Sequence, residues 1–142
     1  MSRLLVSFLL LAGSGALAAT GCAVDTPAGQ CVCTEEFRLH SVLVLDDAFQ
    51  PVPDADVTVT NRRTGERLES GWLGQLASGY YVVADDGMLR SFSAGGDSVR
   101  LDGTANAGSF SADFVFRPDP CACHLLRVAG PDTIVVGEPP PP

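Results

Sequence analysis

Two cysteine pairs near the ends of the chain constrain its fold more than any other feature. Cys31 and Cys33 flank a single valine, and Cys121 and Cys123 flank a single alanine. In an extended strand, residues two apart have Cα atoms about 6.6 Å apart, close to the limit for a direct disulfide, so we expect bridges between the pairs. An antiparallel arrangement joins Cys31 to Cys123 and Cys33 to Cys121. A parallel arrangement joins Cys31 to Cys121 and Cys33 to Cys123, and the sequence leaves both open.

The alternative for these four cysteines is a metal site. Their thiolates, with His124 beside them, can hold a soft ion tetrahedrally. Structural zinc sites usually separate their cysteines by two to four residues, however, whereas these pairs have one. Disulfides are favoured for an exported protein, and one bridge across a loop of about 90 residues would stabilise the fold by roughly 4–5 kcal/mol.

The N-terminus predicts export. Arg3 precedes an apolar stretch from Leu4 to Ala12, and small residues follow. This order is typical of a secretory signal peptide, and the stretch is shorter than the roughly 20 apolar residues of a membrane-spanning helix.

The segment Ala19-Thr20-Gly21-Cys22 resembles a bacterial lipobox, in which the cysteine is diacylated and cleavage occurs before it. That pattern prefers leucine where this chain has Ala19. The alternative is ordinary cleavage after Ala16-Leu17-Ala18, which fits the A-x-A pattern. Cysteine parity favours lipidation, because assigning Cys22 to lipid leaves four of the five cysteines for an oxidising compartment.

These signals divide the chain into four parts. We expect a lipoprotein signal peptide at 1–21, a lipidated Cys22 with a short tether at 22–30, a β-sandwich at 31–136 and a proline-rich tail at 137–142. The expected location is the bacterial cell envelope, lipid-anchored, with the outer membrane favoured because Ala23 is not an acidic retention residue of the enterobacterial kind.

Apolar residues alternate with polar ones along much of the remaining chain, which predicts strands. Phe37, Leu39, Leu43 and Leu45 are predicted to share the inner face of the first strand. Turn residues fill 46–54 and 61–66, and Gly65 is suited to a positive φ. Further strands are predicted at 55–60, 67–70, 80–84, 88–92, 98–102, 110–116, 123–128 and 133–136, with Asp85-Asp86-Gly87 as a hairpin turn.

No segment after the signal peptide has a convincing helical period. The 15 glycines and 10 prolines also suit a turn-rich β protein. The sequence therefore predicts an all-β fold, a single antiparallel β-sandwich of seven or eight strands.

The segment from Gln50 to Asn61, followed by Thr64-Gly65, resembles carboxypeptidase regulatory-like domains. The later run Ser78-Gly79-Tyr80-Tyr81 is similar to their Gly-x-Tyr strand. The resemblance covers roughly residues 37–136 and implies a transthyretin-like sandwich. It implies no catalytic residues, since the catalytic domain of those enzymes has no counterpart in this chain.

Charge and chemistry exclude several functions. The chain has a net charge of −8 and no lysine, so it is poorly suited to binding nucleic acid. His40 and His124 are the two histidines, too few for a three-ligand catalytic zinc site.

Tyr80 and Tyr81 are adjacent, point to opposite faces of a strand and cannot both ligate one iron. The pairs Asp46-Asp47 and Asp85-Asp86 are read as turn formers rather than calcium ligands.

The expected function is a binding or structural accessory module of the cell envelope, anchored to the membrane by lipid, without a cofactor and without enzymatic activity. A protein or carbohydrate of the envelope is the expected partner. A small envelope enzyme and a cysteine-based metal-binding protein are the alternatives.

Overall fold

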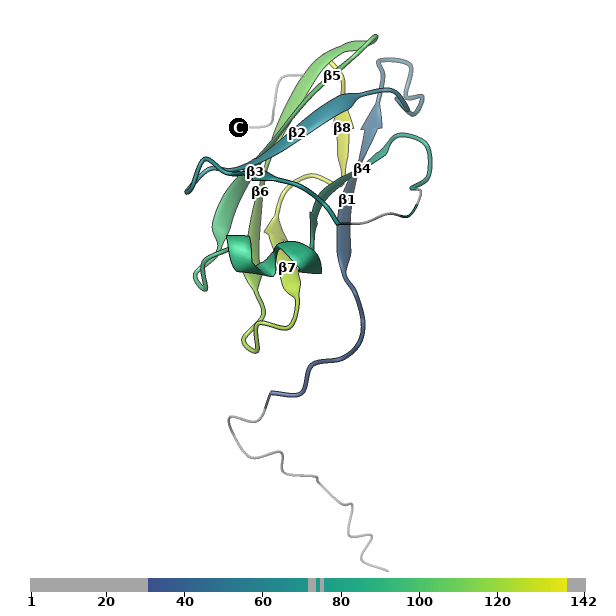
Figure 1. The fold of residues 1–142 in the computed structure, drawn as a ribbon. Helices are drawn as coiled ribbons and strands as arrows, with labels where there is room; N and C mark the ends of the chain where they lie inside the picture. Colours follow the sequence, from purple (N-terminus) through teal and green to yellow (C-terminus); the bar gives the residue numbers. More distant parts are fainter. Residues whose placement is uncertain (1–30, 72–73, 75, 138–142) are drawn as a thin grey trace, which may run out of the picture. The chain divides into compact units, whose positions relative to one another are not determined.

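The computed structural model describes residues 31–71, 74 and 76–137, and these residues form two β-sheets (Figure 1). Within them, one sheet has three strands in the order β4-β1-β8, and the other has five in the order β3-β2-β5-β6-β7. The all-β, two-sheet prediction is confirmed. The elements are β1 (Leu39–Leu45), β2 (Asp56–Asn61), β3 (Arg67–Leu68), β4 (Tyr80–Asp85), the 3₁₀-helix η1 (Asp86–Ser91), β5 (Asp97–Ala105), β6 (Gly108–Pro118), β7 (Leu125–Ala129) and β8 (Thr133–Val135).

The predicted signal peptide, Cys22 and the tether (residues 1–30) lie outside the described residues, as does the tail from residue 138. Among the residues that are described, none belongs to a helix long and apolar enough to cross a membrane.

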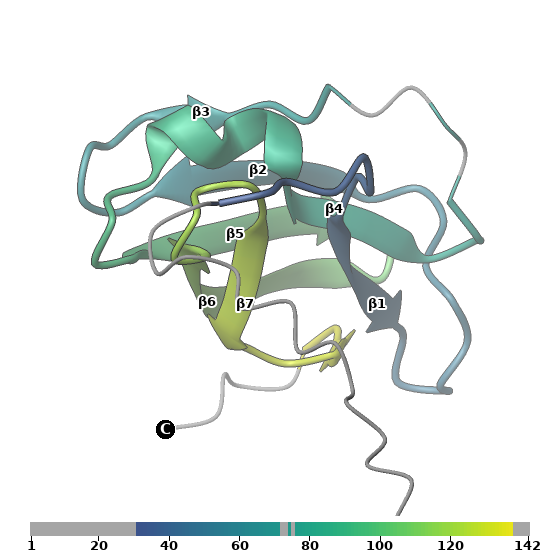
Figure 2. The ribbon, with the colours of Figure 1, turned by 90° about the horizontal axis from the view of Figure 1, so that it is seen from below.

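The core lies between the two sheets (Figure 2). Phe110, Ala112, Phe114 and Phe116 alternate along β6, and all four are buried, as their spacing predicts. Each such phenylalanine contributes about 1.5–3 kcal/mol through burial. The three-stranded sheet completes the same cluster with Val42, Val44, Val83, Ala84 and Ile134.

The predicted inner face of the first strand is wrong. Val42 and Val44 are fully buried, whereas Leu43 is half-buried and Phe37 is exposed. The pairing of β1 with β4 is irregular between His40 and Ser41, where Val83 is the extra residue of a bulge in β4. The faces of β1 itself are unchanged, and His40, against the Phe116 ring, lies on the same face as Val42 and Val44. The continuous apolar run from Val42 to Leu45 has no alternation that could reveal which of its two faces is buried.

One strand pair of the described chain departs from the expected antiparallel pattern. β8 runs parallel to β1, with Leu43 opposite Thr133 and Leu45 opposite Val135. Parallel neighbours need a long connection, and here the whole five-stranded sheet lies between them in the sequence.

The predicted hairpin around Asp85-Asp86-Gly87 is also wrong, because residues 86–91 form η1. The Asp85 side chain caps this helix by accepting the N–H of Gly87 at 2.8 Å, and it also accepts the hydroxyl of Ser70. Met88 and Phe92 are buried against the core from η1 and its end rather than from a strand. The capping bond fixes Asp86 at the start of the helix, where it becomes part of the site described below.

A buried polar cluster fastens the β2–β3 turn to the chain after η1. The Asp97 carboxylate accepts hydrogen bonds from Arg63 Nη2 at 3.1 Å, Asn61 Nδ2 at 3.2 Å and the Ser93 N–H at 2.8 Å. The hydrogen bond from Arg63 lowers the pKa of Asp97 despite its burial. The predicted turn is confirmed here, with Gly65 at φ 72°.

Candidate functional site

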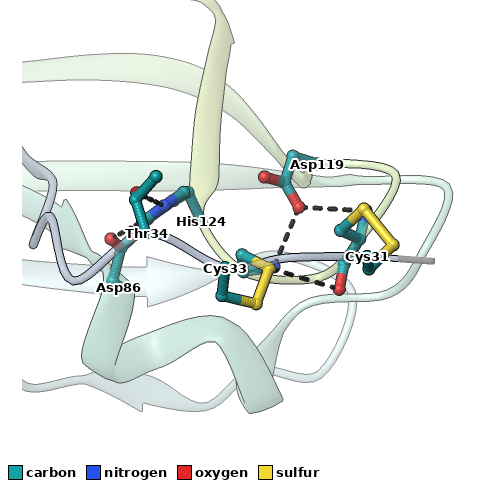
Figure 3. The surroundings of a disulfide bond; sticks show 8 residues. Cys31, Cys33, Thr34, Asp86, Asp119 and His124 are labelled. Carbon is teal, nitrogen blue, oxygen red and sulfur yellow. Dashed lines mark hydrogen bonds and ion pairs between the residues drawn. A yellow bond between two sulfur atoms is a disulfide. The ribbon is translucent and has the colours of Figure 1, made fainter. Parts of the chain in front are cut away.

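Two disulfides fasten the N-terminal segment to the connection between β6 and β7 (Figure 3). Cys31 is bonded to Cys121 and Cys33 to Cys123, with Cα–Cα distances of 5.5 and 5.4 Å. This is the parallel one of the two pairings that the sequence left open. The pairs do not lie in strands, since residues 31–34 have no regular structure and residues 121–124 form a turn and bend.

Asp119 shapes the turn that carries Cys121 and Cys123. Its carboxylate accepts the N–H of Cys123 at 2.8 Å and that of Cys121 at 3.2 Å, while its own N–H donates to the carbonyl of His124 at 2.8 Å. Ala122 between the cysteines adopts a positive φ of 52°. This tight turn points both sulfurs toward the N-terminal segment, and the bond from Cys123 lowers the pKa of Asp119.

Beside the disulfides, the Asp86 carboxylate joins three segments of the chain. It accepts the Arg38 N–H at 2.8 Å, the Leu125 N–H at 2.7 Å and His124 Nδ1 at 2.7 Å. The Asp86 N–H donates in return to the Arg38 carbonyl at 3.1 Å. The lead-in to β1, the start of η1 and the start of β7 therefore meet at one nearly buried side chain, which is 8% exposed.

The hydrogen bonds to Asp86 also decide its charge. Burial raises the pKa of Asp86, but the bonds from His124 and from the two backbone N–H groups outweigh this effect, so the pKa lies below its ordinary value. Asp86 is thus a carboxylate at neutral pH, and His124 Nδ1 must carry the proton that it donates. His124 Nε2 forms a hydrogen bond with the Thr34 hydroxyl at 3.0 Å, in which the Nδ1–H tautomer of the ring is the acceptor.

The resulting series of hydrogen bonds runs from the Thr34 hydroxyl through His124 to Asp86 (Figure 3). Its first effect is mechanical, because it holds the residue next to Cys33 against the sandwich. Its connectivity is also that of a hydroxyl nucleophile, a general base and the carboxylate that orients the base. Thr34 is exposed while His124 is 5% exposed, so solvent reaches the hydroxyl end of the chain.

Other residues considered from the sequence have structural roles. His40 is half-buried, contacts the Phe116 ring and forms a hydrogen bond between Nε2 and the Leu125 carbonyl at 3.0 Å. Tyr81 donates to the Val52 carbonyl at 2.7 Å, and its neighbour Tyr80 is 41% exposed, as predicted for one packed and one surface tyrosine. Asp46 is the predicted turn former and accepts two backbone N–H groups of its own loop.

The metal alternative draws no support from these contacts. The disulfides leave no thiolate among the four paired cysteines. Within the described ranges, no group of three or more His, Cys, Asp or Glu side chains is placed to hold an ion.

Sequence reasoning missed Thr34, Asp86 and Asp119 as members of this site. Thr34 and His124 are 90 residues apart, and Asp86 and His124 are 38 apart, so no local motif connects them. The one available signal is that Thr34 and His124 each directly follow the second cysteine of a pair. A parallel pairing of the cysteines brings those two residues together.

Comparison of the chain with protein-family models, with curated proteins and with solved structures finds no match. The resemblance to carboxypeptidase regulatory-like domains therefore stays a prediction.

Removing both bridges is expected to lower the free energy of unfolding by more than the sum of the two single removals. Each closes a loop with a sequence separation of 90. Once one is formed, the second closes a ring of only a few residues, so losing either alone should lower the free energy of unfolding by about 2 kcal/mol in the chain-entropy model. Replacing all four cysteines with serine should lower it by roughly 6–7 kcal/mol. Urea unfolding of the two double variants and the quadruple variant measures these values. Double-variant losses that add up to the quadruple loss would show that the bridges close independent loops.

Acid should weaken the fold through Asp86. Because its pKa is lower in the folded than in the unfolded chain, the carboxylate stabilises the fold above the unfolded value of about 3.9, and this contribution is lost as the pH falls through the folded value. Asp86→Asn should lower the free energy of unfolding at pH 7 by about 1–3 kcal/mol, since an amide cannot accept all three donors. The variant should also show a shallower loss of stability below pH 4, measured by urea unfolding from pH 7 to pH 2.

The control for that experiment is Asp47→Asn, at an exposed residue whose side chain lies outside this cluster. It should leave the pH dependence of stability as it is in the wild type. Equal slopes for the wild type and Asp86→Asn would contradict the role given to Asp86.

Proposed function

We propose that the protein is an exported, lipid-anchored binding module of the bacterial cell envelope, without catalytic activity as its main role. The observation that carries the proposal is the pairing of Cys31 with Cys121 and Cys33 with Cys123. Disulfides of this kind persist in oxidising compartments, which supports export. They also use four of the five cysteines and leave Cys22, which follows Ala19-Thr20-Gly21.

The bridges also limit the length of the tether that this proposal requires. With Cys31 fixed to the sandwich, the residues between a lipidated Cys22 and the first bridge are 23–30. Random-coil scaling gives eight residues a root-mean-square reach of about 16 Å, so the disulfide end of the domain would sit close to the bilayer. A binding surface on such a module is best placed at the opposite end.

The proposal is tested at Cys22. Cys22→Ser should move the protein from the membrane fraction to the soluble envelope fraction and remove the acyl mass from its N-terminal peptide. Ala19→Leu is the matched variant, since it restores the leucine of the lipobox pattern and should keep the protein lipidated. Mass spectrometry of the N-terminal peptide and membrane fractionation give the readouts. A wild-type protein that is soluble, begins at Ala19 and carries no acyl group would overturn the anchor.

An acyl-transfer enzyme is the second candidate, favoured by the chain from Thr34 through His124 to Asp86. In such a reaction the Thr34 oxygen would bond to an acyl carbon and give its proton to His124 Nε2. The leaving alcohol would take that proton, and water would then release the acyl group by the same route. This candidate ranks second because attachment of the N-terminal segment to the sandwich already accounts for the hydrogen bonds among Thr34, His124 and Asp86.

A fluorophosphonate separates the two candidates, since it bonds to an activated hydroxyl with loss of fluoride. The enzyme candidate requires a phosphonate adduct on Thr34 in the folded wild type and in Thr34→Ser, and none in Thr34→Val. Absence of the adduct from the folded wild type, or equal labelling of unfolded protein, would remove the candidate and leave the binding module.

A further inference from the structure

A groove of about 580 Å³ lies at the end of the sandwich opposite the disulfides. We call it the distal groove, and it is lined by Asp46, Asp47, Ala107, Val135, Val136 and Gly137. β1 runs from the disulfide end toward it, and β6 runs from the neighbouring turn back to the disulfide end (Figure 1). The groove is thus separated from Cys31 by the length of β1, roughly 20 Å for seven residues.

One wall of the distal groove is the edge strand β8. In the described part of the chain β8 pairs with β1, and it is the last strand of its sheet. The Leu43 N–H donates to the Asp132 carbonyl, and the Val136 N–H donates to the Leu45 carbonyl. In a parallel ladder these bonds direct the N–H and C=O of Ile134 toward β1 and those of Thr133 and Val135 away from it. The outward groups of Val135 lie where an added strand would pair.

The charges around the groove favour a cationic occupant. Asp46 and Asp47 line it, and neither belongs to an ion pair among the described residues. The Asp46 carboxylate is held in place because its Oδ1 accepts the N–H groups of Ala48 and Gln50 at 2.9 and 2.8 Å. A fixed carboxylate at Asp46 and a second one at Asp47, beside the apolar residues Ala107 and Val135, suit a segment that carries both basic and apolar side chains.

The same loop presents an aromatic ring. Phe49 is 69% exposed and has a positive φ of 57°, a conformation that costs a residue with a side chain about 1–2 kcal/mol. The loop is held by the bonds to Asp46, including the Phe49 N–H to the Asp46 carbonyl at 3.0 Å. A rigid, exposed phenylalanine of this kind is a suitable anchor for an apolar side chain of a partner.

We propose that the distal groove binds an extended segment of a partner protein in which arginine or lysine alternates with apolar residues. The segment adds as a strand to the outer edge of β8, so that its backbone pairs with Val135. Its basic side chains then face Asp46 and Asp47, and its apolar side chains face Ala107 and Val135, which line the groove, and the Phe49 ring. The inference rests on the proposed role as a binding module, whose partner class it names, and it does not depend on lipidation of Cys22.

The test is fluorescence anisotropy with a labelled peptide of alternating arginine and valine and the full-length protein purified from the cell envelope. A peptide of alternating glutamate and valine controls for charge. A third peptide, methylated on alternate backbone nitrogens, keeps the charge but cannot form the ladder. The arginine–valine peptide should bind, more weakly at high salt, and the other two should bind at least about tenfold more weakly.

Two protein variants locate the site. Asp46→Asn with Asp47→Asn removes both groove charges, and the asparagine at 46 keeps the oxygen that accepts the loop N–H groups. This variant should keep the thermal midpoint of the wild type and bind the arginine–valine peptide about tenfold more weakly. Glu35→Gln with Glu36→Gln removes two charges at the disulfide end and should bind as the wild type does.

Several outcomes overturn the inference. They are the absence of binding, equal binding of the glutamate–valine or methylated peptide, equal effects of the two double variants, and preferential binding of an envelope oligosaccharide. These readouts are independent of the acyl mass at Cys22. A result that contradicts peptide binding at the distal groove can therefore be distinguished from one that contradicts lipidation of Cys22.

Discussion

The carboxylate of Asp86 is the contact on which the arrangement of the disulfide end depends. Three donors from the lead-in to β1 and the start of β7 converge on it, and two of them are backbone N–H groups. These groups lie where the two sheets approach each other without a shared ladder, and unpaired buried N–H groups would destabilise the fold. One side chain thus replaces several ladder bonds, and the disulfides join the same segments covalently.

This arrangement gives the two ends of the sandwich different properties. At the disulfide end the chain is fixed by two covalent bridges, by the Asp119 turn and by the hydrogen bonds to Asp86. At the other end a groove beside an edge strand carries two carboxylates without ion-pair partners among the described residues, and a strained phenylalanine lies in the loop beside it. The module that we propose, attached at the first end and binding at the second, would use both properties.

Much of the fold could be predicted from the sequence because alternation reports directly on burial. The spacing of Phe110, Phe114 and Phe116 identified the core of β6, and Gly65 identified a turn. Alternation misleads where local chemistry outweighs the pattern. Asp85 caps a 3₁₀-helix where a hairpin was predicted, and the continuous apolar run of β1 did not reveal that Val42 and Val44 face the core.

The candidate site was less predictable, since its members are distant in the sequence. The four cysteines could be identified from their matched spacing, but their pairing depends on the path of the chain. Asp86 and His124 each had a plain local interpretation, as a turn former and as a residue at a strand end. Only the folded chain brings them to 2.7 Å. Lipidation of Cys22 and the carboxypeptidase regulatory-like resemblance stay predictions.

Amide hydrogen exchange of Arg38 and Leu125, followed by NMR at pH 7, tests the central claim most directly. Both N–H groups donate to Asp86, so the account predicts that they exchange through global unfolding, as slowly as the N–H of Leu101 in the middle of β5. Exchange as fast as that of the exposed Asp47 amide would show that the N-terminal segment and the start of β7 are not held by this carboxylate.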